Sequence, residues 1–452
     1  MAIAPTSGAR ALAADAPLSG YQLMVVGLCI LINICDGLDA IVTSFAAPVL
    51  IQDWNLPAQT LGLIHGAGAT GLMIGALLVS PQADRIGRRP LIIMGSFVST
   101  LAMFGLSFSN SVEMLVVFRC LSGIAVGSLL PSLSVMVIEY SNEARGNLFL
   151  ALVHIGFAAG AALAGLLGAT MLDEYGWRGI FFAAGCITAL VSLAAAILLP
   201  ESLYFLTSRQ PRNALPKANK LLARLKVAPL EKLPPKTTTS RRSPIAIGAL
   251  LAKPLLFATL FLWLAAFLRY FVSYFLTSWK PQMLVLAGFD AETAATVGIA
   301  TSLASALGVL TMGILATRFG APRTASVTFL MAAVAMVGFG VFDSPEALVS
   351  FALLAMFSIE ATFTGVMITA ARLYPESIRA TGVGFAVGIG RFGAILGPSI
   401  GGIVIGMGLE RSSYMLIYAG AATLGAAAIA IVGMLAARIY AEGKAPPATE
   451  TA

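Results

Sequence analysis

The sequence predicts an all-α integral membrane protein with twelve transmembrane helices, arranged as two pseudo-symmetric six-helix halves. The first supporting observation is composition: 58% of the 452 residues are hydrophobic and only 11% are charged, with a mean hydropathy of +0.90. Those values lie far from the ranges of water-soluble chains. The second is a series of apolar runs of bilayer-spanning length, and the third is a motif that recurs in the two halves.

Twelve apolar runs are long enough to cross a bilayer, which takes about 20 residues. The first six lie near residues 21–47, 59–79, 91–109, 114–138, 148–170 and 179–199. The second six lie near residues 255–278, 294–315, 324–342, 347–371, 381–409 and 414–437.

A polar stretch between the two sets of runs is long enough to serve as a linker. The predicted organisation is an N-terminal tail (1–20), a six-helix bundle (21–199), a cytoplasmic linker (200–253), a second six-helix bundle (254–437) and a C-terminal tail (438–452).

The distribution of the 28 Lys and Arg residues predicts the orientation, because positive charge near span ends is retained in the cytoplasm. The predicted outer loops hold only Arg178, Lys280 and Arg411. We therefore expect a bacterial inner-membrane protein with both tails and the linker in the cytoplasm. Basic loops facing anionic headgroups account for the net charge of +7 without nucleic acid. The first run is too long for a signal peptide and lacks a cleavage site.

The loops that follow matching spans repeat one another. Residues 84–89 (DRIGRR) correspond to residues 317–323 (TRFGAPR) at an offset of 233, and residues 143–146 (EARG) correspond to 377–380 (SIRA) at an offset of 234. Two independent matches at nearly one offset indicate duplication. Facing halves with a binding site near the midplane are typical of secondary transporters.

These motifs resemble those of a known family. Residues 80–89 (SPQADRIGRR) resemble the major facilitator loop signature Gly-x-Leu-Ala-Asp-Arg-x-Gly-Arg-Arg, departing at Ser80 and Gln82. The spacing of Arg119, Gly123, Gly127 and Pro131 is similar to the superfamily's span-four motif, and Pro200-Glu201-Ser202 fits as well. More narrowly, Asp36-Gly37-Leu38-Asp39 resembles the Asp-Gly-x-Asp hallmark of the aromatic acid:proton symporters. The resemblance implies the major facilitator fold and proton-coupled import of an aromatic carboxylate.

Charged residues inside the spans are the candidate functional residues, because each costs roughly 2.5 to 3.5 kcal/mol at mid-span. Six occur: Asp36, Asp39, Arg119, Arg269, Glu360 and Arg391. Three are acids and three are bases, so mutual pairing is an alternative to ligand binding.

Asp36 and Asp39 are the candidate proton carriers. They are separated by about 60° around a helix, so both carboxylates point into one sector. Two close carboxylates in a dry site tend to share a proton. Alternatively, one aspartate caps a break at Gly37 or pairs with a neighbouring helix. Arg119 is expected to hold one aspartate ionised, or to form a purely structural ion pair.

Arg391 is the first choice for the substrate carboxylate, because a planar guanidinium binds both oxygens. Its span is dense with glycine, which permits close helix approach: Gly388, Gly390, Gly393, Gly397, Gly401 and Gly402. The alternative is that Arg391 only pairs with Glu360. Arg269 is expected in a cavity, contacting either substrate or Glu360, and Glu360 itself is a candidate second protonation site.

An aromatic stripe accompanies Arg269, with Trp263, Phe267, Tyr270 and Tyr274 at i, i+4, i+7 and i+11. These rings are candidates for flanking an aromatic substrate. Packing or lipid-facing aromatics are the alternative.

The resemblance implies a conformational latch at the loop after span two, formed by Asp84, Arg85, Gly87, Arg88 and Arg89 and bridging to span eleven. Basic residues for orientation alone would explain the arginines but not the aspartate, which the positive end of a helix favours.

His65 and His154 could relay protons, but each stands alone in its span without an acidic neighbour at helical spacing, so their role is left open. The cysteines are expected to be packing residues rather than metal ligands or disulfides: Cys29, Cys35, Cys120 and Cys186.

The sequence therefore predicts a proton-coupled symporter for a hydroxybenzoate- or benzoate-type acid, working by alternating access as a monomer without cofactor or metal. The physics of the residues requires only a small organic anion. A symporter for another anion such as muconate would fit the loops equally, whereas three buried arginines disfavour a sugar. A drug exporter would carry a proline that the span-five pair Gly156 and Gly160 lacks. An intramembrane enzyme would need a nucleophile and a base at the same depth in the membrane, and the sequence offers no such pair.

Overall fold

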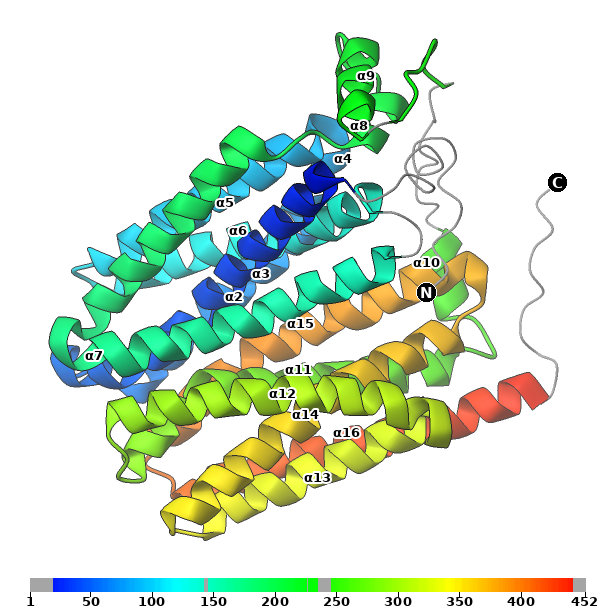
Figure 1. Cartoon of the computed structure of the whole chain (residues 1–452). Helices are drawn as coiled ribbons and strands as arrows, with labels where there is room; N and C mark the ends of the chain where they lie inside the picture. The colour runs from blue at the N-terminus through cyan, green and yellow to red at the C-terminus, as the bar shows by residue number, and fades with distance from the viewer. Residues whose placement is uncertain (1–18, 142–144, 226, 235–244, 442–452) are drawn as a thin grey trace. The chain divides into compact units, whose positions relative to one another are not determined.

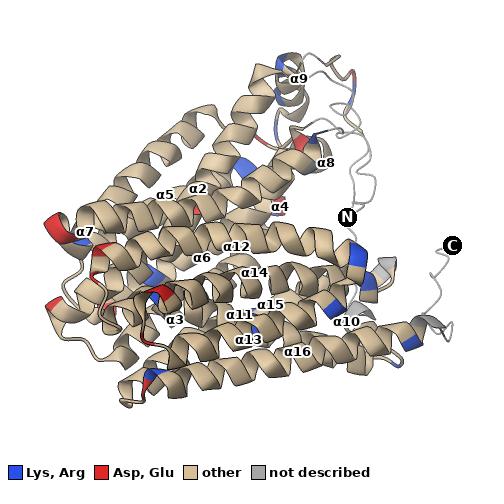
Figure 2. Cartoon of the chain, turned by 60° about the horizontal axis from the view of Figure 1, so that its bottom comes forward, with Lys and Arg blue, Asp and Glu red and all other residues tan. Residues whose placement is uncertain are grey.

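The computed structural model describes residues 19–141, 145–225, 227–234 and 245–441, which form helices and connecting turns without a strand (Figure 1). Eleven of these helices are long and apolar enough to cross a membrane. Large apolar side chains cover their outer surfaces; Leu190 and Ile314, for example, are 70% and 71% exposed. Such exposure is unfavourable in water and expected against lipid. Figure 2 shows that charged residues concentrate toward helix ends.

The N-terminal half begins with α2 (Gly20–Trp54), α3 (Ala58–Ile74), a π-helical turn (Gly75–Val79), a 3₁₀ turn (Ser80–Gln82), α4 (Ala83–Ile86), α5 (Arg88–Ser107), α6 (Val112–Glu139) and α7 (Gly146–Leu198). The linker contains α8 (Leu203–Ser208), α9 (Ala214–Arg224) and α10 (Ile245–Leu250). The C-terminal half comprises α11 (Leu256–Leu286), α12 (Ala291–Phe319), α13 (Ala321–Val341), α14 (Pro345–Leu373), α15 (Glu376–Gly406) and α16 (Arg411–Ala441).

Helix α7 consists of two helices joined at Gly176. A straight helix of its 53 residues would be about 80 Å long, far more than the roughly 30 Å hydrocarbon core. Gly176 interrupts it with a φ of 63° and a ψ of −172°, a conformation open to glycine. The two parts correspond to the predicted runs 148–170 and 179–199.

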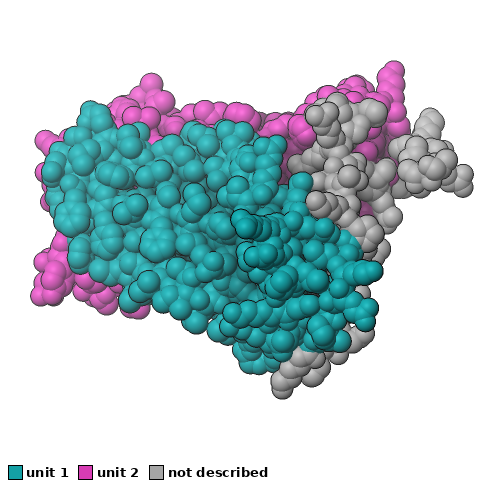
Figure 3. Space-filling model, turned by 90° about the horizontal axis from the view of Figure 1, so that it is seen from above, with its two compact units in different colours: residues 1–42, 70–164, 178–239 teal, residues 43–69, 165–177, 240–452 magenta. Residues whose placement is uncertain are grey.

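The chain forms two compact units, coloured separately in Figure 3. Unit 1 comprises residues 1–42, 70–164 and 178–239, and unit 2 comprises residues 43–69, 165–177 and 240–452. The division at 21–199 and 254–437 remains a prediction. Residues 1–18, 142–144, 226, 235–244 and 442–452, which include most of both predicted tails and the repeat residues Glu143 and Ala144, lie outside the described residues.

The linker is more ordered than its polar composition suggests. Helix α9 alternates apolar and basic residues at helical spacing, and its Ala218 and Leu222 are fully buried in the core of unit 1 beside Val25 and Ile32 of α2. Its Lys217 and Lys220 are exposed. In unit 2, α11 packs against α15 and α16, and α13 packs against α14 and α16.

The repeated loops share a backbone conformation as well as a sequence. Gly87 joins α4 to α5 with a φ of 103°, and Gly320 joins α12 to α13 with a φ of 85°. Both values favour glycine over residues with a Cβ atom. The match at an offset of 233 residues therefore has a structural counterpart.

Candidate transport site

Unit 1 holds Asp36 and Asp39 of α2 in unequal environments. Both are buried, at 2% and 1% exposure. The Asp39 carboxylate pairs with Arg119 at 3.1 Å between Oδ1 and Nη1, and it accepts a hydrogen bond of 2.6 Å from Ser99 Oγ. In contrast, Oδ2 of Asp36 has no hydrogen-bond partner among the described residues. Asp39 is therefore paired with a cation, whereas the described residues supply no ion-pair partner for Asp36.

Arg119 of α6 is fixed against α2 by more than this ion pair. It also donates to the backbone carbonyls of Asp39 at 2.8 Å and Ala40 at 2.7 Å. Helix α2 runs unbroken past Gly37, so neither aspartate caps a break there. A methyl group at Gly37 would instead overlap the carbonyl oxygen of Phe157 on α7, which shows that this glycine permits close helix packing.

Unit 2 places Glu360 of α14 in a similar arrangement. Its Oε2 lies 2.5 Å from Nη2 of Arg269, and its Oε1 accepts a 2.7 Å hydrogen bond from Ser273 Oγ, both from α11. Of the two partners considered for Arg269, the structure therefore shows Glu360. The guanidinium of Arg269 also lies over the rings of Phe363 at 4.4 Å and Tyr270 at 4.9 Å, where cation–π attraction operates.

Arg391 of α15 is not paired with Glu360. Its Nη1 donates to the hydroxyl of Tyr274 at 3.0 Å, and its guanidinium lies 5.4 Å from the centre of the Tyr270 ring. Its Nε is buried without a hydrogen-bond partner among the described residues. A methyl group at Gly393, beside Arg391, would overlap the Phe267 carbonyl oxygen, so the glycine-rich helix does approach α11 closely.

The aromatic stripe of α11 divides into two parts. Tyr270 and Tyr274, whose ring centres are 6.0 Å apart, lie at the arginines. Trp263 stacks on Phe385 with ring centres 5.9 Å apart, and Phe267 stacks on Phe271 with ring centres 6.1 Å apart. The two tyrosines together with Phe363 therefore form the aromatic surroundings of Arg269 and Arg391.

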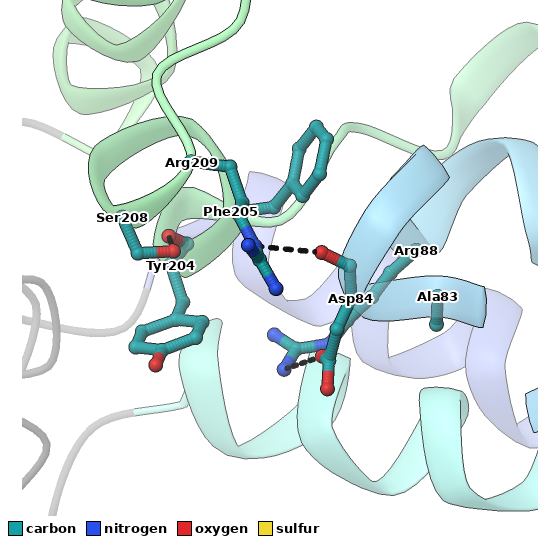
Figure 4. A pocket seen from close by; sticks show the side chains of 7 residues that line it. All are labelled: Ala83, Asp84, Arg88, Tyr204, Phe205, Ser208 and Arg209. Atoms are coloured by element: carbon teal, nitrogen blue, oxygen red, sulfur yellow. Dashed lines mark hydrogen bonds and ion pairs between the residues drawn. The ribbon is translucent and has the colours of Figure 1, made fainter. Parts of the chain in front are cut away.

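The residues predicted as a latch form a network within unit 1. Arg88 lies 3.7 Å from Asp84, forms an ion pair with Glu139 and donates to Ser202 Oγ at 2.9 Å. Figure 4 shows Arg88 and Asp84 facing side chains of α8 and of Arg209, which directly follows this helix. Arg209 donates a hydrogen bond to the Asp84 carbonyl at 3.0 Å. Arg85 is exposed. The predicted bridge to span eleven remains a prediction.

Glu201 caps the N-terminus of α5. Its Oε1 accepts hydrogen bonds from the backbone N–H groups of Arg88 at 3.0 Å and Arg89 at 3.1 Å, donors that a helix start leaves unsatisfied. Arg89 in turn donates to the Leu199 carbonyl at 2.7 Å. Tyr140 donates to the Glu201 carbonyl at 2.6 Å, and burial raises the pKa of this tyrosine, so it remains a donor.

Sequence reasoning placed one cation wrongly and missed several partners. Lys280, expected in an outer loop, lies inside α11 and is 7% exposed, because that helix continues eight residues beyond the predicted end of its span, to Leu286. Neutral partners such as Ser99 and Ser273 carry no sequence signal. Glu139 ends a span helix, a position where an acid is ordinary.

The two histidines are placed differently. His65 of α3 is buried, with its ring centre 6.2 Å from that of Trp279, whereas His154 is exposed. All four cysteines are free thiols. Among the described residues there is no cluster of His, Cys, Asp and Glu that could hold a metal ion.

The sequence is similar to those of known membrane transporters. The Major Facilitator Superfamily model matches residues 29–301 and again residues 262–451. The chain is 32% identical to a gallate transporter of Pseudomonas putida, over 87% of this chain and 88% of that protein. It is 31% identical to the 4-hydroxybenzoate transporter PcaK of Pseudomonas aeruginosa, over 93% of this chain and 94% of that protein.

Solved structures support the fold. A bacterial homologue of the lysosomal transporter Spinster superposes with a TM-score of 0.68 at 17% identity, covering 95% of this chain and 98% of that one. A D-xylose–proton symporter superposes with a TM-score of 0.69 at 16% identity, covering 91% of this chain and 97% of that one. The predicted all-α major facilitator fold and the assignment as a transporter rather than an enzyme are thereby confirmed, whereas the count of twelve spans remains a prediction. The chain belongs to the Major Facilitator Superfamily, among its aromatic acid transporters.

Proposed function

We propose that this protein imports an aromatic carboxylate of the hydroxybenzoate or benzoate type together with protons, by alternating access. The substrate class is supported by the relatives that are named as gallate, 4-hydroxybenzoate and benzoate transporters. We place the protein in a bacterial inner membrane as a monomer with both termini in the cytoplasm.

The observation that carries the proton coupling is the difference between Asp36 and Asp39. Asp39 has a guanidinium and a hydroxyl as partners, whereas Oδ2 of Asp36 has none among the described residues. A buried carboxylate without a cation is costly when ionised. Asp36 is therefore the site at which the transported proton binds, and Asp39 stays ionised beside Arg119.

The substrate carboxylate binds Arg391. Its guanidinium is oriented by Tyr274 and keeps an Nε–H that has no partner in the part of the chain that the structure describes. A guanidinium binds both oxygens of a carboxylate in one plane. The aromatic ring of the substrate packs among Tyr270, Tyr274 and Phe363, with Arg269 held beside them by Glu360. Glu360 is a second carboxylate whose protonation would release Arg269 toward the anion.

The driving force suffices for accumulation. One proton carried with a monovalent carboxylate moves no net charge, so its drive is the pH gradient, each unit of which supplies about 1.4 kcal/mol or tenfold accumulation of the substrate. Each proton beyond the first adds one net positive charge, for which a membrane potential of 100 mV supplies about 2.3 kcal/mol more.

The test is uptake of radiolabelled 4-hydroxybenzoate into proteoliposomes with an imposed inward proton gradient. Wild type is compared with Asp36→Asn and Arg391→Ala, and with Asp173→Asn as a control on an exposed carboxylate. We expect gradient-driven uptake in wild type and the control, and its loss in both other variants. Correctly inserted wild type that accumulates muconate but neither 4-hydroxybenzoate nor benzoate would contradict the substrate class.

A further inference from the structure

Lys280 is a buried cation that the transport site described above does not use. Its Nζ donates to Thr301 Oγ1 of α12, and the Thr301 hydroxyl donates in turn to the Gly298 carbonyl at 2.9 Å. Thr301 is fully buried. No acidic side chain in the described ranges forms an ion pair with Lys280.

The space beside Lys280 offers no other counter-charge. A small cavity next to it is lined by apolar side chains, among them four methionines: Met283, Met336, Met356 and Met415. An ammonium group has three donors, and the described residues supply an acceptor for one of them. Removing such a charge from water costs several kcal/mol when it is left unpaired. Lysine, unlike arginine, gives up its proton readily when it is buried.

This cavity lies one helical turn from the Glu360 cluster. On α14, Met356 lines the cavity and Glu360 is four residues further along, on the same face. On α11, Ser273 holds Glu360, and Lys280 is seven residues away, again on the same face. Lys280 and Glu360 therefore belong to one interior, which also contains Arg269.

The charge of Lys280 interacts with that of Glu360, but Glu360 is already paired with Arg269, and the other described groups around Lys280 add no free counter-charge. Helix α3 contributes His65, which packs on the neighbouring Trp279. Helix α12 contributes the uncharged Thr301, and α13 contributes Met336 and Phe339. Helix α16 contributes Arg411, one turn from Met415, but Arg411 is paired with Asp343.

The net charge of the interior of unit 2 connects Lys280 with anion binding. With a neutral amine, the interior of unit 2 contains Arg269, Arg391 and Glu360, a net charge of one positive unit. A bound carboxylate alone or a proton on Lys280 alone changes this charge by one unit, whereas both together leave it unchanged. Charge changes are resisted strongly away from water, so the two binding events favour each other.

We propose that Lys280 is a proton-binding residue of unit 2 whose protonation is coupled to binding of the transported carboxylate. The amine lone pair takes a proton from water when the anion binds and returns it to water when the anion leaves. This rests on the function proposed above and adds a second transported proton to the one on Asp36.

The proton-to-substrate ratio tests this. It is measured in proteoliposomes, with the membrane potential held at zero, from the 4-hydroxybenzoate gradient that just balances an imposed pH gradient. We expect Lys280→Met to lower the ratio by one proton per substrate relative to wild type. Lys220→Met, on the exposed face of α9, is the matched control and should leave it unchanged. An unchanged ratio in active Lys280→Met overturns the inference and leaves the proposed function standing.

Two further variants cover the case in which Lys280→Met does not insert. Thr301→Val removes the acceptor of the ammonium group, so gradient-driven uptake should become half-maximal at a lower pH than in wild type. Lys280→Arg keeps a permanent charge, so the KM should depend less on pH than in wild type, because only Asp36 still titrates, while kcat falls because the anion leaves slowly. Wild-type pH profiles in both variants would refute the role of Lys280. Wild-type protein that carries no aromatic carboxylate would refute the proposed function itself.

Discussion

Arg119 donates two hydrogen bonds to Asp39. Its Nη1 lies 3.1 Å from the carboxylate Oδ1 and 2.8 Å from the backbone carbonyl oxygen of that residue. Asp36, one turn earlier on α2, has no such partner for its Oδ2 within the described ranges. A motif that looks symmetric in sequence therefore contains two different carboxylates.

Asp36 and Asp39 should respond differently to neutralisation. Asp36→Asn removes only a proton site, so the folded protein should retain exchange of labelled for unlabelled substrate while gradient-driven uptake falls at least tenfold. Asp39→Asn leaves Arg119 buried beside a neutral amide, which should lower stability by about 3 to 5 kcal/mol. Thermal unfolding in detergent, combined with exchange and driven uptake, checks both. Equal stability losses in the two variants would contradict the assignment.

Arg391→Lys tests bidentate recognition of the substrate carboxylate. Lysine keeps the charge but loses the planar pair of donors, so affinity for 4-hydroxybenzoate should fall roughly tenfold or more, about 1.4 kcal/mol. Titration calorimetry of the detergent-solubilised protein measures the change. Tyr274→Phe removes only the hydroxyl that orients Arg391 and should have a smaller effect. A lysine variant that binds as tightly as wild type argues against Arg391 as the anchor.

Two glycines of α15 make a matched pair. Gly393 approaches the α11 backbone so closely that a methyl group would overlap it, whereas Gly388 has open space. Alanine is favoured over glycine in a helix by about 0.5 to 1 kcal/mol, so Gly388→Ala should raise the unfolding temperature slightly. Gly393→Ala should lower it and reduce uptake because α11 and α15 are pushed apart. Identical unfolding temperatures for the two variants would show that the close packing is unimportant.

The repeated loop glycines make a second pair. Gly87 and Gly320 both have positive φ values, but only Gly87 lies against a charged side chain, since a methyl group there would be 2.5 Å from Oε2 of Glu201. Alanine at either position costs about 1 to 3 kcal/mol from backbone strain. Gly87→Ala should lose more because it also disturbs the cap of α5. Thermal unfolding compares the two, and a larger loss for Gly320→Ala would count against the Glu201 cap.

The sequence alone predicted the membrane-spanning architecture, the internal repeat and the positions of Asp36, Asp39, Arg119, Arg269, Glu360 and Arg391 inside the spans. Hydropathy and motif spacing are local properties, and a charge within an apolar run is visible without knowing its neighbours. The DRIGRR motif likewise identified the loop whose Gly87 turns out to need a positive φ.

Only the tertiary structure decided which charges meet. Asp39 and Arg119 are 80 residues apart, and Arg269 and Glu360 are 91 apart. Such pairs depend on how each helix is rotated about its axis and on which helix lies beside it, and neither is contained in a hydropathy pattern. The length of α11, which continues to Leu286, likewise places Lys280 in the interior instead of a loop, because the end of an apolar run does not have to coincide with the end of a helix.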